Sequence, residues 1–120
     1  MPVSELSTPR TGLTTHVLDT ARGRPAAGLT ISLRGPHGLA VEATTNADGR
    51  TDEPLVATLV DGTYELTYAV GAYFDDLTAP SSTKPYLDLV PVRVRLAEAD
   101  GHVHVALLVT PWSYTTYRGS

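Results

Sequence analysis

Apolar and polar side chains alternate along several short segments of this chain. Residues 62–70, 91–97 and 102–109 carry apolar or aromatic side chains at every second position. This is the period at which one face of a β-strand repeats. Turn-forming residues separate such segments at 35–38, 46–49 and 100–101. The pattern predicts about seven or eight short strands in an all-β antiparallel sandwich, with one short helix near residues 71–77.

The length and the spread of glycine and proline indicate a single domain. The chain has 120 residues, and its ten glycines and nine prolines are distributed evenly rather than gathered into a linker. Neither residue favours helix interiors, which supports the β prediction. We expect residues 1–12 to form a flexible segment and residues 13–120 to form one sandwich domain with a thin core.

Composition excludes several classes of function. The net charge of −4 disfavours nucleic-acid binding, which requires a basic face. The absence of cysteine rules out disulfides and a thiolate nucleophile. No stretch approaches the roughly 18 apolar residues of a membrane span, and the N-terminal residues do not resemble a signal peptide. We therefore expect a cytoplasmic protein that binds neither nucleic acid nor membranes.

His102 and His104 lie on one face of a predicted strand whose other face is Val, Val, Leu and Val. If the valine face packs into the core, both imidazoles point outward, towards solvent or another subunit. Such a pair suits acid–base chemistry, because imidazole titrates near neutrality. It could also bind a metal, although no third ligand lies at a recognised spacing. The pair alone is most simply interpreted as two exposed histidines.

His16 and Arg50 are two further candidates on separate segments. His16 lies in a strand-like run, and Asp19 should point to the opposite face, so we expect no His–Asp dyad. Arg50 follows the turn at residues 46–49, where its guanidinium could bind a carboxylate or an imide-like edge. Aligning Gly49 with a calcium loop puts Thr44 and Leu55 where carboxylates are required, so that interpretation fails.

The C-terminus is unusual because an aromatic, strand-like run continues almost to the last residue. The chain ends in Tyr117, Arg118, Gly119 and Ser120, whereas the ends of most domains are poorly ordered. An incidental ending is the simplest interpretation of this tetrapeptide on its own.

Four motifs in this order resemble the 5-hydroxyisourate hydrolases, the transthyretin-like enzymes of purine and urate degradation. They are THVLDT at 15–20, DGR at 48–50, HVH at 102–104 and the terminal YRGS. The resemblance covers residues 13–120, and the terminal tetrapeptide is its most specific part, since hormone-carrying transthyretins lack it. Ala106, Trp112 and the segment 86–88 depart from the family's usual residues, which affects loops and the pocket rim.

The resemblance implies a transthyretin-like β-sandwich of two four-stranded sheets with one short helix. It also implies a homotetramer with active sites at a subunit interface, and no metal or organic cofactor. The small-molecule substrate would be 5-hydroxyisourate, whose six-membered ring is opened to 2-oxo-4-hydroxy-4-carboxy-5-ureidoimidazoline. The main alternative is a non-catalytic transthyretin-like carrier of a small aromatic ligand, and a secreted adhesive sandwich is a third.

The resemblance also implies the site residues. The catalytic positions are His16, Arg50, His104 and Ser120. The substrate-binding positions are His16 and Arg50 again, together with Tyr117, Arg118 and Gly119. We expect the two histidines to perform acid–base work, Arg50 to stabilise negative charge, and the terminal residues to orient water or substrate. The residues do not show which histidine acts as base.

Overall fold

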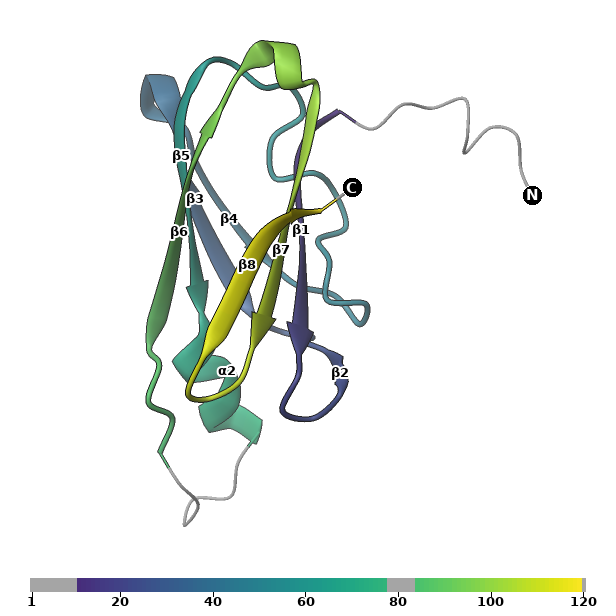
Figure 1. The fold of residues 1–120 in the computed structure, drawn as a ribbon, viewed down its shortest axis with the longest axis vertical. Helices are drawn as coiled ribbons and strands as arrows, with labels where there is room; N and C mark the ends of the chain where they lie inside the picture. The colour runs from purple at the N-terminus through teal and green to yellow at the C-terminus, as the bar shows by residue number, and fades with distance from the viewer. Residues whose placement is uncertain (1–10, 78–83, 120) are drawn as a thin grey trace, which may run out of the picture.

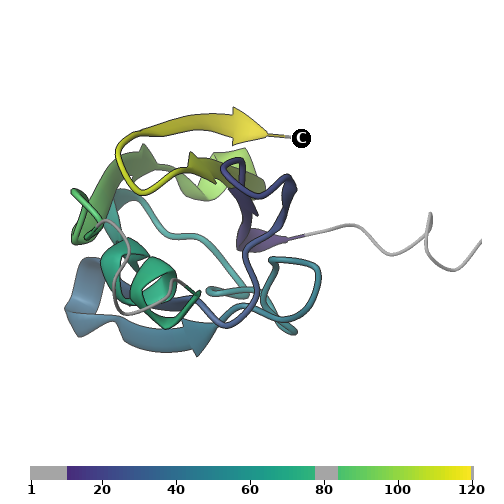
Figure 2. The same cartoon turned by 90° about the horizontal axis from the view of Figure 1, so that it is seen from below.

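Two four-stranded sheets pack face to face and are drawn in Figures 1 and 2. The structure, a computed structural model, describes residues 11–77 and 84–119. The first sheet has the order β2 (Arg24–Pro25), β1 (Gly12–Asp19), β7 (His102–Val109) and β8 (Tyr114–Gly119). The second has the order β4 (Ala40–Thr44), β3 (Thr30–Arg34), β5 (Gly62–Ala69) and β6 (Leu89–Leu96). The helix α2 (Val70–Leu77) follows β5, and two short 3-10 turns are η1 (Pro36–Gly38) and η2 (Glu98–Asp100).

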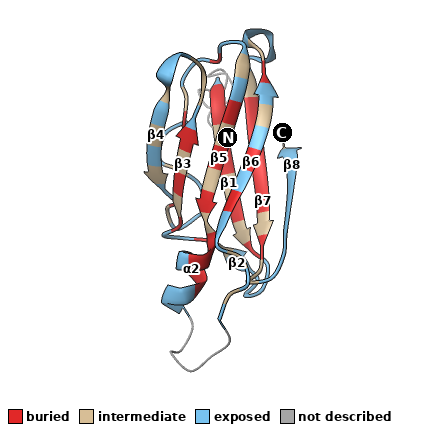
Figure 3. Cartoon of the chain, turned by 90° about the vertical axis from the view of Figure 1, so that its left-hand side faces the viewer, coloured by how far each residue is buried: buried red, intermediate tan, exposed pale blue. Residues whose placement is uncertain are grey.

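The architecture expected from the alternating pattern is confirmed. In β5 the buried residues are Tyr64, Leu66 and Tyr68, which occupy every second position. The same alternation buries Val92 and Leu96 in β6 and leaves Arg93 and Arg95 exposed between them. The inner faces of both sheets form one core, while β8 is exposed along most of its length (Figure 3).

One strand pair differs from the expected antiparallel arrangement. β1 runs parallel to β7, and eight residue pairs lie in register from Gly12 with His102 to Asp19 with Val109. The other five strand pairs among the described residues are antiparallel. β1 enters the sheet between β2 and β7, so its partner is a strand about ninety residues away in sequence.

Two tyrosine hydroxyls tie β1 to the rest of the sandwich from the inside. The Thr15 hydroxyl donates to the Val105 carbonyl at 2.8 Å, so Tyr68 Oη must donate the 2.8 Å bond between the two hydroxyls. The Tyr73 hydroxyl donates to Asp19 Oδ2 at 2.8 Å. All four side chains are buried. Because Thr15, Val17 and Asp19 face inward, the alternate residues Thr14, His16 and Leu18 face outward.

The first strand of the sandwich is joined at its start to the turn before β7. β1 begins at Gly12, whose amide donates to the Gly101 carbonyl at 2.8 Å. Residues 1–10 of the expected flexible segment lie outside the described residues. Over the part of the chain that is described, no helix is long and apolar enough to cross a membrane.

Candidate active site

The outward face of the β1–β7–β8 sheet gathers four of the predicted site residues. Paired residues of neighbouring strands share a face. The β1–β7–β8 registers give one row of Thr14, His104 and Gly119, and a second row of His16, Ala106 and Tyr117. His16 and His104 lie diagonally across these rows, and their ring centroids are 6.4 Å apart. The small Ala106 lies between the side chains of His16 and Tyr117.

Arg50 lies beside His16 on the opposite edge of β1. The two residues form an antiparallel bridge, and the Val17 amide donates to the Gly49 carbonyl at 2.8 Å. Asn46 orders this turn, since its Oδ1 accepts from the amides of Asp48 at 2.9 Å and Arg50 at 3.2 Å. The backbone N–H of Asn46 donates to the Arg50 carbonyl at 2.7 Å. The turn that the sequence predicted therefore carries Arg50 to the strand that carries His16.

Gly49 allows the turn to approach β1 this closely. Its φ of 76° lies in the left-handed region, and a Cβ there would be 2.4 Å from the Val17 carbonyl oxygen. Real Cβ atoms do not approach a backbone oxygen at that distance. Any other residue would push the turn, and with it Arg50, away from His16.

Burial and the neighbouring Arg50 guanidinium both lower the pKa of His16 below its usual value of 6.5, and burial is the larger cause. A hydrogen bond to the Asp48 backbone and the Asp48 charge oppose this shift in pKa. His16 therefore stays neutral down to a lower pH than an exposed histidine. A neutral imidazole can accept one proton and donate another.

His104 is more buried than the sequence suggested. The pair His102 and His104 was most simply interpreted as exposed, but His104 is only 6% exposed within the single chain. Thr14 lies against one side of the ring, and Gly119 lies close on the other, where an added Cβ would be 2.8 Å from His104 Cδ2. The strand pattern could not show this, because both neighbours come from other strands.

Thr14 is a site residue that the sequence analysis missed. Its Oγ1 lies 2.7 Å from His104 Nδ1 and 2.8 Å from His102 Nε2. The signal available in the sequence was its position two residues before His16, which puts both side chains on one face of β1. Nothing in the sequence indicated that this face would meet both histidines of β7.

The C-terminal residues occupy different sides of β8. Tyr117 lies on the same face as His16 and is 55% exposed, whereas Arg118 pairs with the inward-facing Val105. Arg118 Nη2 donates to the His102 carbonyl at 3.3 Å, and Nη1 lies 3.8 Å from Asp100 Oδ1. The Arg118 side chain thus supports the start of β7 rather than the face with the histidines. Ser120 lies outside the described residues.

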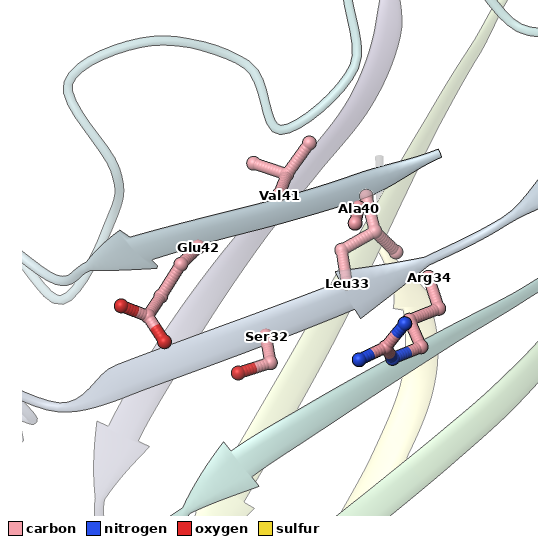
Figure 4. Close-up of a pocket in the computed structure, with 6 residues that line it drawn as sticks. All are labelled: Ser32, Leu33, Arg34, Ala40, Val41 and Glu42. Carbon is pink, nitrogen blue, oxygen red and sulfur yellow. The ribbon is translucent and has the colours of Figure 1, made fainter. Parts of the chain in front are cut away.

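A shallow pocket of about 220 Å³ lies on the other sheet, over β3 and β4. It is shown in Figure 4, in which Ser32, Arg34 and Glu42 lie on one side of these strands and Val41 on the other. It contains none of the predicted site residues. Among the residues that the structure describes, no group of three His, Asp or Glu side chains could hold a metal ion.

These side chains together suit the hydrolysis of a polar, planar molecule. Two imidazoles, one of which has a lowered pKa, can transfer protons, and a guanidinium beside them can donate paired hydrogen bonds to an oxyanion or an imide edge. In the row that runs from Arg50 through His16 and Ala106 to Tyr117, neighbouring residues lie on neighbouring strands. Strands in a sheet are spaced by about 4.8 Å, so Arg50 and Tyr117 stand three such spacings apart, on either side of the histidines. Arg50 and Tyr117 are exposed, so no part of the described chain closes over that space.

Known proteins are similar to this chain in sequence and in fold. The family model described as the HIUase/Transthyretin family matches residues 13–119. The 5-hydroxyisourate hydrolase of Deinococcus radiodurans is 52% identical, over 91% of this chain and 96% of that protein. The structure of Klebsiella pneumoniae 5-hydroxyisourate hydrolase is similar with a TM-score of 0.75 and 33% identity, over 90% of this chain and 98% of that one. Transthyretin from Sparus aurata has a TM-score of 0.78 at 24% identity, over 92% and 97% of the two chains, which shows the shared fold alone.

Replacing Gly49 with alanine is expected to destabilise the protein more than the same change at Gly28. Both glycines have φ near 80°, a conformation that costs alanine about 1–2 kcal/mol. Only Gly49 would also clash with a backbone oxygen, since nothing lies within 4 Å of a Cβ at Gly28. Urea unfolding of Gly49→Ala and Gly28→Ala measures the loss in the free energy of unfolding that each change causes. Equal losses would contradict the close approach of the turn to β1.

Replacing Arg50 with glutamine is expected to raise the pKa of His16 towards 6.5, because the nearby positive charge disappears while burial remains. Arg50→Lys keeps a positive charge and should leave the pKa of His16 near its wild-type value. Titration of the His16 ring by NMR measures both. If Arg50→Gln titrates like the wild type, the guanidinium charge is not a cause of the shift.

Proposed function

We infer that this chain, which belongs to the HIUase/Transthyretin family, is a hydrolase that opens the six-membered ring of 5-hydroxyisourate. The observation that carries this proposal is the meeting of His16, Arg50 and His104 on one outward face of a chain whose relatives bear that enzyme's name. The product would be 2-oxo-4-hydroxy-4-carboxy-5-ureidoimidazoline. The reaction is hydrolysis of a cyclic amide.

Opening a cyclic amide requires three contributions from the protein. A base must remove a proton from water as its oxygen attacks the carbonyl carbon. The carbonyl oxygen must be stabilised while it carries negative charge. The ring nitrogen must receive a proton as its bond to that carbon breaks. The hydroxyl part of the water ends in the new carboxyl group and its remaining hydrogen ends on the ring nitrogen, so no other reactant is needed.

We assign the proton transfers to His16 and His104. Their ring centroids are 6.4 Å apart on one face of the sheet, so both rings can contact the same small molecule bound over that face. His16 is neutral near pH 7 because burial and Arg50 lower its pKa. A neutral imidazole exchanges protons at both nitrogens, so one histidine can take the proton from water while the other supplies one to the leaving nitrogen.

Arg50 would bind the substrate and stabilise the developing negative charge. Its guanidinium presents paired N–H donors that match the N–C=O edge of a urate-like ring. The bridge to His16 puts this positive group next to the acid–base pair. Tyr117 lies two strands from His16 on the same face and would contact the other end of the ring.

The last two residues would complete the site. Gly119 leaves space beside the His104 ring, since any side chain there would meet Cδ2. We propose that the Gly119 backbone and Ser120 orient water or substrate, a role that rests on the family resemblance of the terminal YRGS. The Arg118 side chain contributes indirectly through its bond to the His102 carbonyl.

The substrate is a small molecule in this proposal, and no metal or organic cofactor takes part. The carrier alternative is not favoured, because the likeness to transthyretin shows the fold alone whereas the identity to named hydrolases extends over most of the chain. A cytoplasmic location stays a prediction from the sequence.

We further propose that the chain acts as a homotetramer with its sites at a subunit interface. The β8 strand is an edge strand whose residues are largely exposed, and unpaired edges favour pairing with another chain. The aromatic side chains of Trp112, Tyr114 and Tyr117 are 58%, 43% and 55% exposed along or beside it. A second copy would cover these rings and close the open space above His16.

Replacing His104 with asparagine is expected to reduce the hydrolysis of freshly generated 5-hydroxyisourate by roughly 10²- to 10⁴-fold, because an acid–base group is lost. The decay of the substrate's ultraviolet absorbance measures turnover against the buffer reaction. His37→Asn is the matched control, because His37 is exposed and its φ of 58° suits asparagine.

Three outcomes of this assay are informative. Hydrolysis by the wild type and by His37→Asn, with a large loss in His104→Asn, supports the proposal. No acceleration by the wild type would refute the assigned activity. Near wild-type turnover in His104→Asn would remove that histidine from the mechanism while leaving the activity intact.

The oligomer is tested by sedimentation equilibrium at micromolar concentration. We expect a mass four times the 12.8 kDa of the chain, with activity that falls as dilution separates the subunits. A monomer that keeps full activity would contradict the shared interface, because a single chain leaves the site open.

A further inference from the structure

The Thr14 hydroxyl lies between two imidazoles of β7. It is 2.7 Å from His104 Nδ1 and 2.8 Å from His102 Nε2. The two rings do not touch one another, since their centroids are 6.4 Å apart. One hydroxyl therefore contacts both imidazoles, so its single hydrogen links the tautomer of one ring to that of the other.

Counting hydrogens restricts the tautomers of this pair. A threonine hydroxyl has one hydrogen to donate and two lone pairs that accept. If neither His104 Nδ1 nor His102 Nε2 carried a hydrogen, the Thr14 hydroxyl could donate to only one of them. The lone pair of the other nitrogen would then point at a lone pair of Thr14 Oγ1. At least one of His104 Nδ1 and His102 Nε2 must therefore carry a hydrogen.

The proposed reaction selects one of the remaining arrangements. His104 Nδ1 is occupied by Thr14, so a proton from water can be accepted only at Nε2, on the far side of the ring. Nε2 has a lone pair in the neutral ring only when the hydrogen is on Nδ1. That hydrogen must then be donated to Thr14 Oγ1, at the observed 2.7 Å.

We propose that Thr14 is a positioning residue that holds His104 as the Nδ1–H tautomer, with His102 accepting the Thr14 hydroxyl hydrogen at Nε2. This inference rests on the proposed hydrolysis. The order of donation runs from His104 Nδ1–H to Thr14 Oγ1, and from Thr14 Oγ1–H to His102 Nε2. When Nε2 takes a proton, the Nδ1 hydrogen stays in place and continues to donate to Thr14.

This arrangement matches the general design of an oriented base. Such a base uses one nitrogen for chemistry and binds a third group through the other, which sets its tautomer and direction. The His104 ring is also confined by Gly119 and is 6% exposed, so it has little freedom to adopt another orientation. The first histidine of the HVH motif thereby acquires a role at the site without contacting the substrate.

The tautomer of the wild-type protein is the first test, and it needs no substrate. Nitrogen-15 NMR of the imidazoles, at a pH where both rings are neutral, should show hydrogen on His104 Nδ1 and none on His104 Nε2 or His102 Nε2. Hydrogen on His104 Nε2 instead would overturn the inference. The NMR measurement does not depend on whether the protein hydrolyses 5-hydroxyisourate. The inference about Thr14 and the proposed activity can therefore be refuted independently of each other.

Variants of Thr14 provide the second test. Thr14→Val keeps the side-chain shape without the hydroxyl and should lower kcat roughly 10- to 100-fold, the range typical of partners that orient metal-ligating histidines. KM should change less than about threefold, because Thr14 does not bind the substrate in this arrangement. His104 should show a mixture of tautomers in this variant.

Two controls separate orientation from folding. Thr14→Ser restores a hydroxyl and should recover most of kcat and the single His104 tautomer. Thr20→Val removes a threonine hydrogen bond of 3.1 Å to the Val109 carbonyl, just after the end of β1 and away from the histidines, and should leave kcat unchanged. Wild-type kcat in Thr14→Val, or an equal loss in Thr14→Ser, would overturn the inference. The wild-type NMR result decides it if Thr14→Val does not fold.

Discussion

The in-register parallel pairing of β1 with β7 is the constraint on which the rest of the site depends. It joins Thr14 to His104 and His16 to Ala106 across eight consecutive pairs. Because side chains alternate along a strand, a slip of one residue would turn His16 and Thr14 into the core. The same slip would carry buried Val17 to the surface, so the apolar core and the candidate site require the same register.

The register is reinforced from inside by polar groups rather than by packing alone. Thr15 and Asp19 are buried and accept hydrogen bonds from Tyr68 and Tyr73, which lie in β5 and α2. A buried polar group that loses its partner costs about 1–3 kcal/mol, which penalises other positions of β1. The strand is therefore fixed at two points on its inner face, and its outer face is available for chemistry.

On that outer face, the histidines of β1 and β7 each contact or lie beside a residue from another segment. Arg50 and burial lower the pKa of His16, and Arg50 reaches it only because Gly49 lets the turn contact β1. Thr14 contacts both histidines of β7. A chain of 120 residues has little material to enclose a pocket. The proposed tetramer resolves this, since a second copy would cover a face that one chain leaves open.

The amino-acid sequence by itself predicted the strands at residues 62–70, 91–97 and 102–109, the helix near residues 71–77, and the opposite faces of His16 and Asp19. These features follow from side-chain periodicity over a few residues. The family resemblance gave the candidates His16, Arg50 and His104 their expected catalytic roles. Only the tertiary structure decided that β1 lies parallel to β7, that Arg50 adjoins His16, and that His104 is buried against Thr14. These contacts join segments 34 to 90 residues apart, and their register depends on the burial of the whole core, which no local pattern contains.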